Sequence, residues 1–201
     1  MKHTGNLACN LTLAMIAIVL FFTPFCDSVH ARFDPFIVKP YLQIGDAPHS
    51  MNPGSLVLMW HTGDRDRAWS VEIRNGDTGD WDRVEAPTWR HIAVPTIEPH
   101  RVYRAVLTPL EPGTRFEYRV LDGDQHVFSS HGRARRPPGM SCRIAVFADA
   151  ARNTQGQRAV AYHVYQSEPD LVVIPGDIVY DSGRISEYRC LLYTSPSPRD
   201  R

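Results

Sequence analysis

Cysteine is scarce in this sequence, with 4 residues in 201. Cys9 and Cys26 lie in an N-terminal segment that we interpret below as a signal peptide, and Cys190 lies in a Ser/Pro-rich tail. Only Cys142 remains for the folded part of the chain. An internal disulfide is therefore excluded, and the stability of the fold must come from side-chain packing.

An excess of charge of either sign is also absent. The chain has 22 Lys and Arg residues and 22 Asp and Glu residues, so its formal net charge is zero. No basic stripe runs along an expected helix. We therefore expect no binding to a nucleic acid or to another long polyanion.

The sequence also lacks a hydrophobic run that would comfortably span a membrane. The N-terminus combines Lys2 and His3 with a largely apolar stretch from Leu11 to Phe25 and ends in Val29-His30-Ala31. This order is typical of a secretory signal, and the apolar stretch would barely cross a bilayer. We expect residues 1–31 to be a cleaved signal peptide, which makes the mature protein secreted or periplasmic without a stable membrane anchor. An uncleaved membrane anchor is the alternative.

The C-terminal tail has an unusual sequence. Residues 190–200 read Cys-Leu-Leu-Tyr-Thr-Ser-Pro-Ser-Pro-Arg-Asp, and back-translated they match one frame of a transposase-based sequencing adapter. The alternative is a genuine Ser/Pro-rich disordered tail. We expect residues 190–201 to derive from the adapter, with the natural reading frame continuing beyond about Arg189.

Short segments of alternating apolar and polar residues fill the region from Phe36 to about Arg136. Turn dipeptides such as Asn75-Gly76 and Asp122-Gly123 separate them. Several short strands with closely spaced turns predict an antiparallel β-sandwich of about a hundred residues. Three expected strands place apolar side chains on one face with a period of two: Leu56, Leu58 and Trp60; Trp69, Val71 and Ile73; Phe116, Tyr118 and Val120.

Three parts of this region carry a resemblance to a known domain. They are Pro40-Tyr-Leu-Gln43, the strand that ends in Trp60-His-Thr62, and the stretch from Leu110 to Val120. Together they resemble a fibronectin type III domain and, more narrowly, the N-terminal domain of purple acid phosphatases. The resemblance implies that residues 33–137 form such a domain.

The segment from Gly132 to Gly139 is expected to be a linker. Its two prolines and its flanking glycine suit neither a helix nor a central strand. Its three arginines could contact an anionic ligand, although the sequence favours the interpretation that they are solvated linker charges. A second domain is expected over residues 140–189.

This second domain begins with two apolar runs, Arg143–Ala148 and Asp170–Pro175. Between them, residues 155–166 predict a helix with Val160 and Val164 on one face. A strand, a helix and a strand in this order predict a right-handed βαβ unit with parallel strands.

An aspartate lies just beyond each of these runs, Asp149 after the first and Asp177 after the second. The carboxyl ends of parallel strands lie along one edge of a sheet, so we expect the two side chains to converge. Two carboxylates brought together repel each other unless a cation lies between them. The pattern therefore predicts a metal site.

The segments Asp149-Ala-Ala151 and Gly176-Asp-Ile-Val-Tyr180 resemble the first two metal-binding blocks of calcineurin-like metallophosphoesterases. Tyr180 points to the purple acid phosphatase branch. The resemblance implies that Asp149 binds the first metal, that Asp177 bridges both metals, and that Tyr180 donates its phenolate to the first. The implied cofactor is a dinuclear centre of iron with zinc, manganese or a second iron, and hard oxygen ligands suit such cations.

Four further positions bear on the expected site. Gly176 is expected to let the backbone turn sharply beside the metals. Arg152 and Asn153 could reach a phosphate oxygen of the substrate, although a capping role in the loop is the favoured alternative. The family often has glycine or histidine at the position of Ala151, and alanine binds no metal, so Tyr180 becomes the more necessary ligand.

Histidine does not complete the site. No histidine lies in a Gly-Asn-His or Gly-His-x-His context, the blocks that supply the family's remaining ligands. The expected architecture is an all-β fibronectin III-like sandwich followed by the first βαβ portion of an α/β metallophosphoesterase domain. The expected function is that of a secreted enzyme hydrolysing phosphate esters, with the 201 residues inactive by themselves. The alternative is a secreted fibronectin III-like binding module with a non-catalytic phosphoesterase remnant.

Overall fold

The computed structural model describes residues 34–76, 78–95, 97–149, 154–180 and 182. The expected signal peptide and the expected adapter-derived tail lie outside these residues. In the part of the chain that is described, no helix is long and apolar enough to cross a membrane.

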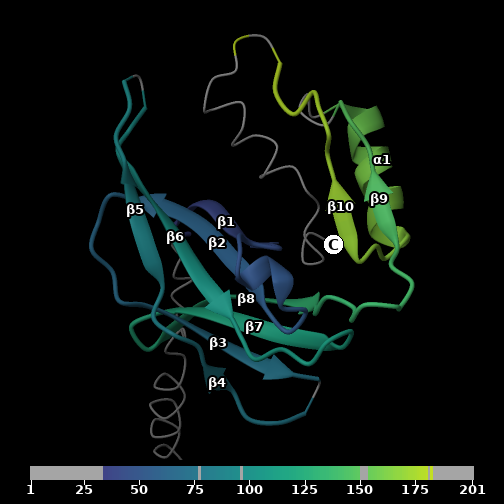
Figure 1. Ribbon diagram of the computed structural model, residues 1–201. Coiled ribbons are helices and arrows are strands. Elements are labelled where there is room, and N and C mark those ends of the chain that lie inside the picture. Colours follow the sequence, from purple (N-terminus) through teal and green to yellow (C-terminus); the bar gives the residue numbers. More distant parts are fainter. Residues whose placement is uncertain (1–33, 77, 96, 150–153, 181, 183–201) are drawn as a thin grey trace, which may run out of the picture. The chain divides into compact units, whose positions relative to one another are not determined.

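Residues 36–133 form two antiparallel sheets of four strands each (Figure 1). The first sheet has the order β1-β2-β6-β5, with β1 at Phe36–Gln43, β2 at Leu56–Gly63, β6 at His100–Leu107 and β5 at Thr88–Ile92. The second has the order β4-β3-β7-β8, with β4 at Asp82–Arg83, β3 at Trp69–Asn75, β7 at Arg115–Asp122 and β8 at Gln125–Arg133. A short 3-10 helix, η1 (His49–Met51), lies between β1 and β2 in sequence.

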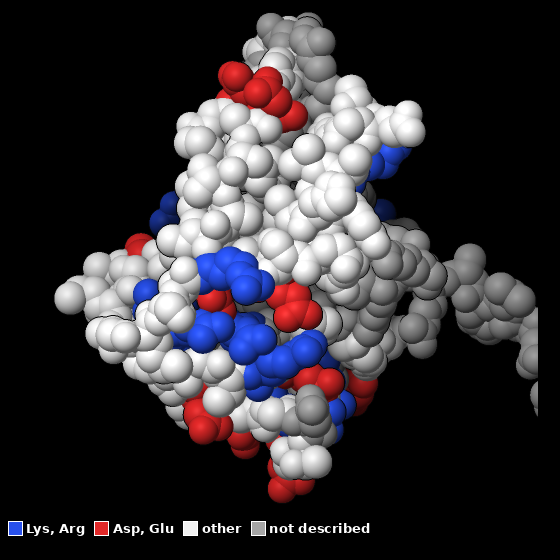
Figure 2. All heavy atoms as spheres, turned by 90° about the vertical axis from the view of Figure 1, so that its right-hand side faces the viewer, with Lys and Arg blue, Asp and Glu red and all other residues white. Residues whose placement is uncertain are grey.

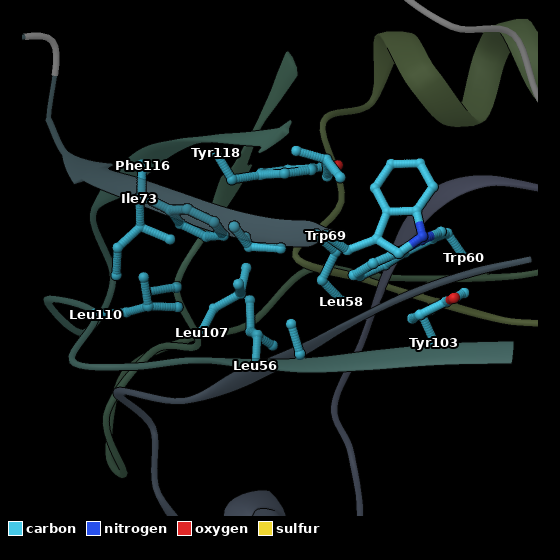
Figure 3. Close-up of a cluster of buried hydrophobic side chains, with 14 of the residues drawn as sticks. Leu56, Leu58, Trp60, Trp69, Ile73, Tyr103, Leu107, Leu110, Phe116 and Tyr118 are labelled. Atoms are coloured by element: carbon cyan, nitrogen blue, oxygen red, sulfur yellow. The ribbon is translucent and has the colours of Figure 1, made fainter. Parts of the chain in front are cut away.

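The core lies between the two sheets, where the side chains with a period of two point toward one another (Figure 3). Trp60 is fully buried and stacks on Tyr103 with ring centroids 5.3 Å apart, while Trp69 meets Trp60 edge-on at 5.9 Å. Burying one large apolar side chain contributes about 1.5–3 kcal/mol. All nine side chains assigned to the buried faces are buried, which confirms the alternation: Leu56, Leu58, Trp60, Trp69, Val71, Ile73, Phe116, Tyr118 and Val120.

The predicted turn at Asp122-Gly123 joins β7 to β8. Asp122 pairs with Gln125, so the hairpin loop contains only Gly123 and Asp124. Gly123 has a φ of +60°, a left-handed conformation that glycine adopts without a steric penalty. The turn chemistry therefore fixes the register of this hairpin.

The expected linker begins later than its composition suggests. Gly132 and Arg133 belong to β8, and Gly132 pairs with Phe116 of β7. Ala134 is buried, and its backbone N–H donates to the Thr114 carbonyl at 2.9 Å. A Cβ atom at position 132 would lie 2.7 Å from Phe116 Cζ, so glycine here makes room for the core rather than for a flexible segment.

The second region contains β9 (Ile144–Val146), α1 (Gln155–Gln166) and β10 (Leu171–Val173). The bounds of α1 agree with the sequence prediction, and its N-terminus is capped by Thr154, whose Oγ1 accepts from the Gln157 backbone N–H at 3.2 Å. The strands β9 and β10 are shorter than the apolar runs predict, but they pair in parallel as expected, with Leu171 opposite Ile144.

This βαβ segment exposes much of its apolar surface. No residue of α1 is buried, and Val160, on its predicted apolar face, is 45% exposed. Val146 of β9 and Val172 of β10 are 64% and 44% exposed. An α/β sheet is normally covered on both faces, and among the described residues these two strands and one helix have no further layer to bury their apolar side chains.

Gly132→Ala tests the close packing between β8 and the core. The added methyl would collide with Leu42 Cδ1 and Phe116 Cζ, so the free energy of unfolding should fall by about 1–3 kcal/mol. Urea unfolding followed by tryptophan fluorescence measures this change, because Trp60 and Trp69 lie in the core.

Gly63→Ala is the matched control, because no atom lies within 4 Å of an added Cβ at that position and its backbone is not left-handed. Its midpoint should stay close to that of the unchanged protein. Equal midpoints for the two variants would contradict the account of Gly132.

Candidate metal site

The two strand-end aspartates follow paired strands in an unusual backbone conformation. Asp149 comes three residues after the end of β9, and Asp177 comes four residues after the end of β10. Their φ angles are +60° and +51°. Non-glycine residues rarely adopt this region, and a left-handed residue costs about 1–2 kcal/mol. Such conformations cluster at functional sites, where the surroundings hold them.

Tyr180 contacts Asp149 directly. The phenolic O–H of Tyr180 donates a hydrogen bond to Asp149 Oδ1 across 31 positions of sequence. Tyr180 is half-buried and Asp149 is exposed, so the pair lies at the surface of the βαβ segment. The structure therefore brings together two of the three side chains predicted as metal ligands.

The chemistry of this pair fits a hard cation. A phenol oxygen and a carboxylate oxygen at hydrogen-bond distance share one proton, and a cation that replaces this proton would be bound by both oxygens. Among the described residues, no group of three or more His, Cys, Asp or Glu side chains is gathered closely enough to hold a metal. Metal binding and the convergence of Asp177 with Asp149 therefore stay predictions.

Tyr180 differs from a core tyrosine such as Tyr118. Tyr118 is 3% exposed within the sandwich, and its burial raises its pKa to about 12. Its hydroxyl therefore stays protonated in the core. Tyr180 instead directs its hydroxyl to an exposed carboxylate.

The sharp backbone turn expected at Gly176 lies one residue later. Gly176 does not adopt a left-handed conformation, and no atom lies within 4 Å of a Cβ placed on it. The sharp backbone turn falls on Asp177 instead. Arg152 and Asn153, the predicted substrate contacts, lie outside the described residues together with Ala151.

A carboxylate with little exposure, which no sequence pattern indicated, lies at the opposite ends of the same strands. The side chain of Asp170 is 9% exposed. Its Oδ2 accepts from Arg136 Nε at 3.0 Å and from the Arg143 backbone N–H at 2.9 Å, and its Oδ1 lies 3.8 Å from Arg133 Nε. The Arg143 backbone N–H is the largest cause that holds the pKa of Asp170 below its usual range.

The linker arginines therefore have partners within the protein. Arg133 and Arg136 face Asp170, and Arg135 donates to the backbone carbonyls of Ser50 and Asn52. The sequence could not indicate this, because Arg136 and Asp170 lie 34 positions apart.

A pocket of about 650 Å³ adjoins this cluster and is separate from the predicted metal ligands. Its lining includes Asp170 and the apolar side chains of Leu42, Met51 and Met140. Asp149, Asp177 and Tyr180 do not line it. The pocket is therefore not the candidate metal site.

Surface charges on the outer face of the second sheet are largely paired. Arg119 Nε lies 2.6 Å from Glu72 Oε2, and Arg74 pairs with Glu117. Both guanidinium groups also pack on the Trp81 ring, at 4.3 Å and 4.8 Å from its centroid. On the face drawn in Figure 2, basic side chains likewise lie among acidic ones.

A comparison with known protein families matches residues 41–135 to the family described as "Purple acid Phosphatase, N-terminal domain". The β-sandwich is a purple acid phosphatase N-terminal domain. The resemblance seen in the sequence is confirmed, and the match covers the end of β1, from Tyr41 to Gln43, and all of β2 to β8.

Comparison with solved structures relates the chain to a purple acid phosphatase from yellow lupin (Lupinus luteus) seeds. The identity is 18%, the TM-score is 0.61, and the alignment covers 78% of this chain and 33% of the lupin chain. The chain thus spans about a third of the lupin enzyme's length, and the likeness shows a shared fold.

A structure of PhoD aligns at 15% identity and a TM-score of 0.45, covering 74% of this chain and 28% of the other. No curated protein sequence matches.

Asp177→Gly and Asp177→Ala separate the backbone role of this residue from its carboxylate. Both changes remove the carboxylate, but only glycine tolerates a φ of +51° without strain. We expect the alanine variant to lower the local stability of β9 and β10 by about 1 kcal/mol relative to the glycine variant. Amide hydrogen exchange of Leu171–Val173 measures the difference. Indistinguishable exchange in the two variants would show that the left-handed conformation is not maintained in solution.

Proposed function

We propose that this chain comes from a secreted phosphoesterase of the purple acid phosphatase type, which hydrolyses phosphate esters at a dinuclear metal centre. The observation that carries the proposal is the contact between Tyr180 and Asp149 at the carboxyl end of a parallel strand pair. A purple acid phosphatase N-terminal domain precedes this strand pair in the same chain.

Each candidate ligand has a proposed role. Asp149 and Tyr180 would bind the same cation, because their oxygens already lie at hydrogen-bond distance. Asp177 would bridge to a second cation from the neighbouring strand. A bound pair of cations supplies Lewis-acid polarisation of the phosphoryl group and stabilises the attacking and leaving oxygens of an in-line displacement. Iron with zinc, manganese or a second iron is the proposed composition.

The 201 residues by themselves are proposed to be catalytically inactive. Three candidate oxygen ligands leave two hard cations far short of the six or so ligands that each prefers. The exposed apolar side chains of β9, α1 and β10 also indicate a sheet that requires further cover. The proposal of secretion rests on the signal-like pattern of residues 1–31.

The alternative is a secreted fibronectin III-like binding module whose βαβ segment has no catalytic role. It is favoured by one observation, namely that the family match covers only the sandwich. Sequencing the natural gene across the codon for Arg189 distinguishes the two functions. Gly-Asn-His and Gly-His-x-His blocks downstream would support the enzyme, and their absence would support the binding module.

Binding of a hard trivalent probe tests the ligand roles. We expect Tb³⁺ bound by Asp149 and Tyr180 to emit with sensitisation from the Tyr180 ring, and we expect Tyr180→Phe and Asp149→Asn each to abolish that emission. Tyr165→Phe is the matched control, because Tyr165 lies on α1 and is 43% exposed. Saturable emission that persists in Tyr180→Phe would contradict the assignment.

Activity of the same protein tests the proposed incompleteness of the site. With a chromogenic phosphate ester and added iron, zinc or manganese, we expect no turnover above that of the free metals. Clear turnover that disappears in Asp177→Asn would show that the described residues suffice for catalysis.

A further inference from the structure

One carboxylate, that of Asp170, connects four segments of the chain. Arg133 is the last residue of β8, Arg136 lies in the linker, Arg143 precedes β9, and Asp170 itself precedes β10. All three arginines contact the Asp170 side chain, two through guanidinium Nε atoms and one through its backbone N–H. We call this group of four residues the Asp170 clasp.

The clasp is held by main-chain bonds as well as by charge. The backbone N–H groups of Asp170 and Leu171 donate to the Arg143 carbonyl at 2.8 Å and 3.3 Å. The Arg143 guanidinium donates to the carbonyl of Ser167, the C-cap of α1, where a cation also complements the helix dipole. Arg143 therefore joins the start of β9 to the start of β10 and to the end of α1.

The low exposure of the Asp170 side chain distinguishes its ion pairs from ordinary surface pairs. Exposed pairs contribute little, because water competes for both partners. The Asp170 side chain is 9% exposed, and its partners Arg133 and Arg136 are 39% and 30% exposed. A carboxylate that is largely removed from water is costly without partners, and charge-assisted hydrogen bonds are among the strongest that a side chain makes.

The Asp170 clasp lies at the start of the short strands β9 and β10, and the candidate metal ligands lie beyond their ends. β9 and β10 have three residues each, and Leu171 pairs with Ile144 immediately beside the clasp. At about 3.3 Å per residue, the strands extend about 10 Å from there to their carboxyl ends. Asp149 and Asp177 follow those ends. Two paired strands of this length are not stable alone. Their register therefore depends on the contacts that the clasp makes with their first residues.

We propose that Asp170 is a positioning residue, whose carboxylate fixes the starts of β9 and β10 against the linker and thereby aligns Asp149 and Tyr180 with Asp177. This inference rests on the proposed metal-binding function for its consequence, but the clasp itself is independently measurable. Asp170 is not one of the candidate metal ligands, and its proposed role is to position them.

The clasp also sets a pH dependence. The charged groups that face Asp170 are Arg133 from β8 and Arg136 from the linker, and Arg143 contributes its backbone N–H. The Arg143 backbone N–H, with help from these charges, lowers the pKa of Asp170. Its stabilising contribution is therefore complete above the ordinary aspartate range and is lost only as the pH falls through the lowered pKa. We therefore expect Asp170 to stay ionised and to keep its contacts with Arg133 and Arg136 at mildly acidic pH.

Asp170→Asn in the 201-residue protein tests the proposal by two measurements. Hydrogen exchange of the Phe147 and Leu171–Val173 amides should become at least about tenfold faster, because charged hydrogen bonds to a buried group are lost. The Tb³⁺ dissociation constant should rise by about tenfold as the ligands lose their alignment. Amides of β2 and β6 in the sandwich should not change.

Two further variants make the result specific. Asp170→Glu keeps the charge and should restore part of the protection. Asp124→Asn removes the same charge from the exposed β7–β8 turn and should leave both readouts unchanged. In the unchanged protein, protection of β10 should disappear as the pH falls through the lowered pKa of Asp170, and this step should be missing in Asp170→Asn.

The outcomes separate the clasp from the proposed function. Exchange and Tb³⁺ affinity both within twofold of the unchanged protein in Asp170→Asn would overturn the proposal, as would weaker Tb³⁺ binding with unchanged exchange. If the unchanged protein gives no sensitised Tb³⁺ emission while exchange still responds to Asp170→Asn, the proposed function fails and the clasp stands.

Discussion

The parallel pairing of β9 with β10 is the constraint on which the candidate site depends. In an antiparallel pair the residues after the two strands would lie at opposite edges of the sheet, and Asp149 and Asp177 would be separated by its length. The register of Leu171 opposite Ile144 instead sends both strands in the same direction. The hydrogen bond from Tyr180 to Asp149 then joins the segment after β10 to the segment after β9. Strand direction therefore determines which oxygen ligands meet.

The two regions of the chain obtain their stability from different physical sources. The sandwich has a dense core in which Trp60, Trp69 and Tyr103 contact one another, so it needs no disulfide. The βαβ segment has little buried apolar surface and relies on polar attachment at the start of its strands. A domain-sized sheet with helices on both faces would supply the missing burial. The purple acid phosphatase N-terminal domain is thus the stable part of the described chain, and the predicted chemistry lies on the less stable part.

Much of the fold could be predicted from local patterns. The period of two identified the buried faces of three strands, Asp122-Gly123 identified a hairpin, and residues 155–166 identified α1 with its observed bounds. These features follow from the chemistry of neighbouring residues. The positions of Asp149 and Asp177 after parallel strands followed from the order strand, helix, strand.

The rest depends on contacts between distant residues, which leave no local signal. In the sequence, Gly132 resembles a linker residue, but in the structure it packs against Phe116. Arg133 and Arg136 likewise resemble solvated charges in the sequence, but in the structure they face Asp170. A sharp backbone turn was expected at Gly176, because glycine turns without a steric penalty, but the residue with the left-handed backbone is Asp177. At the candidate site, the partner of Tyr180 could be named only through a family resemblance, and the hydrogen bond now gives it a geometric basis.

The most direct test of this account is a crystal structure of the protein soaked with Tb³⁺, with the cation located by its anomalous scattering. We expect a peak bound by oxygens of Asp149 and Tyr180, with the Asp177 carboxylate close enough to share that cation or to bind a second one about 4 Å away. A structure in which the carboxyl groups of Asp149 and Asp177 lie well over about 10 Å apart, or point to opposite faces of the sheet, would contradict it, because cation–oxygen bonds of about 2–2.5 Å cannot bridge that gap.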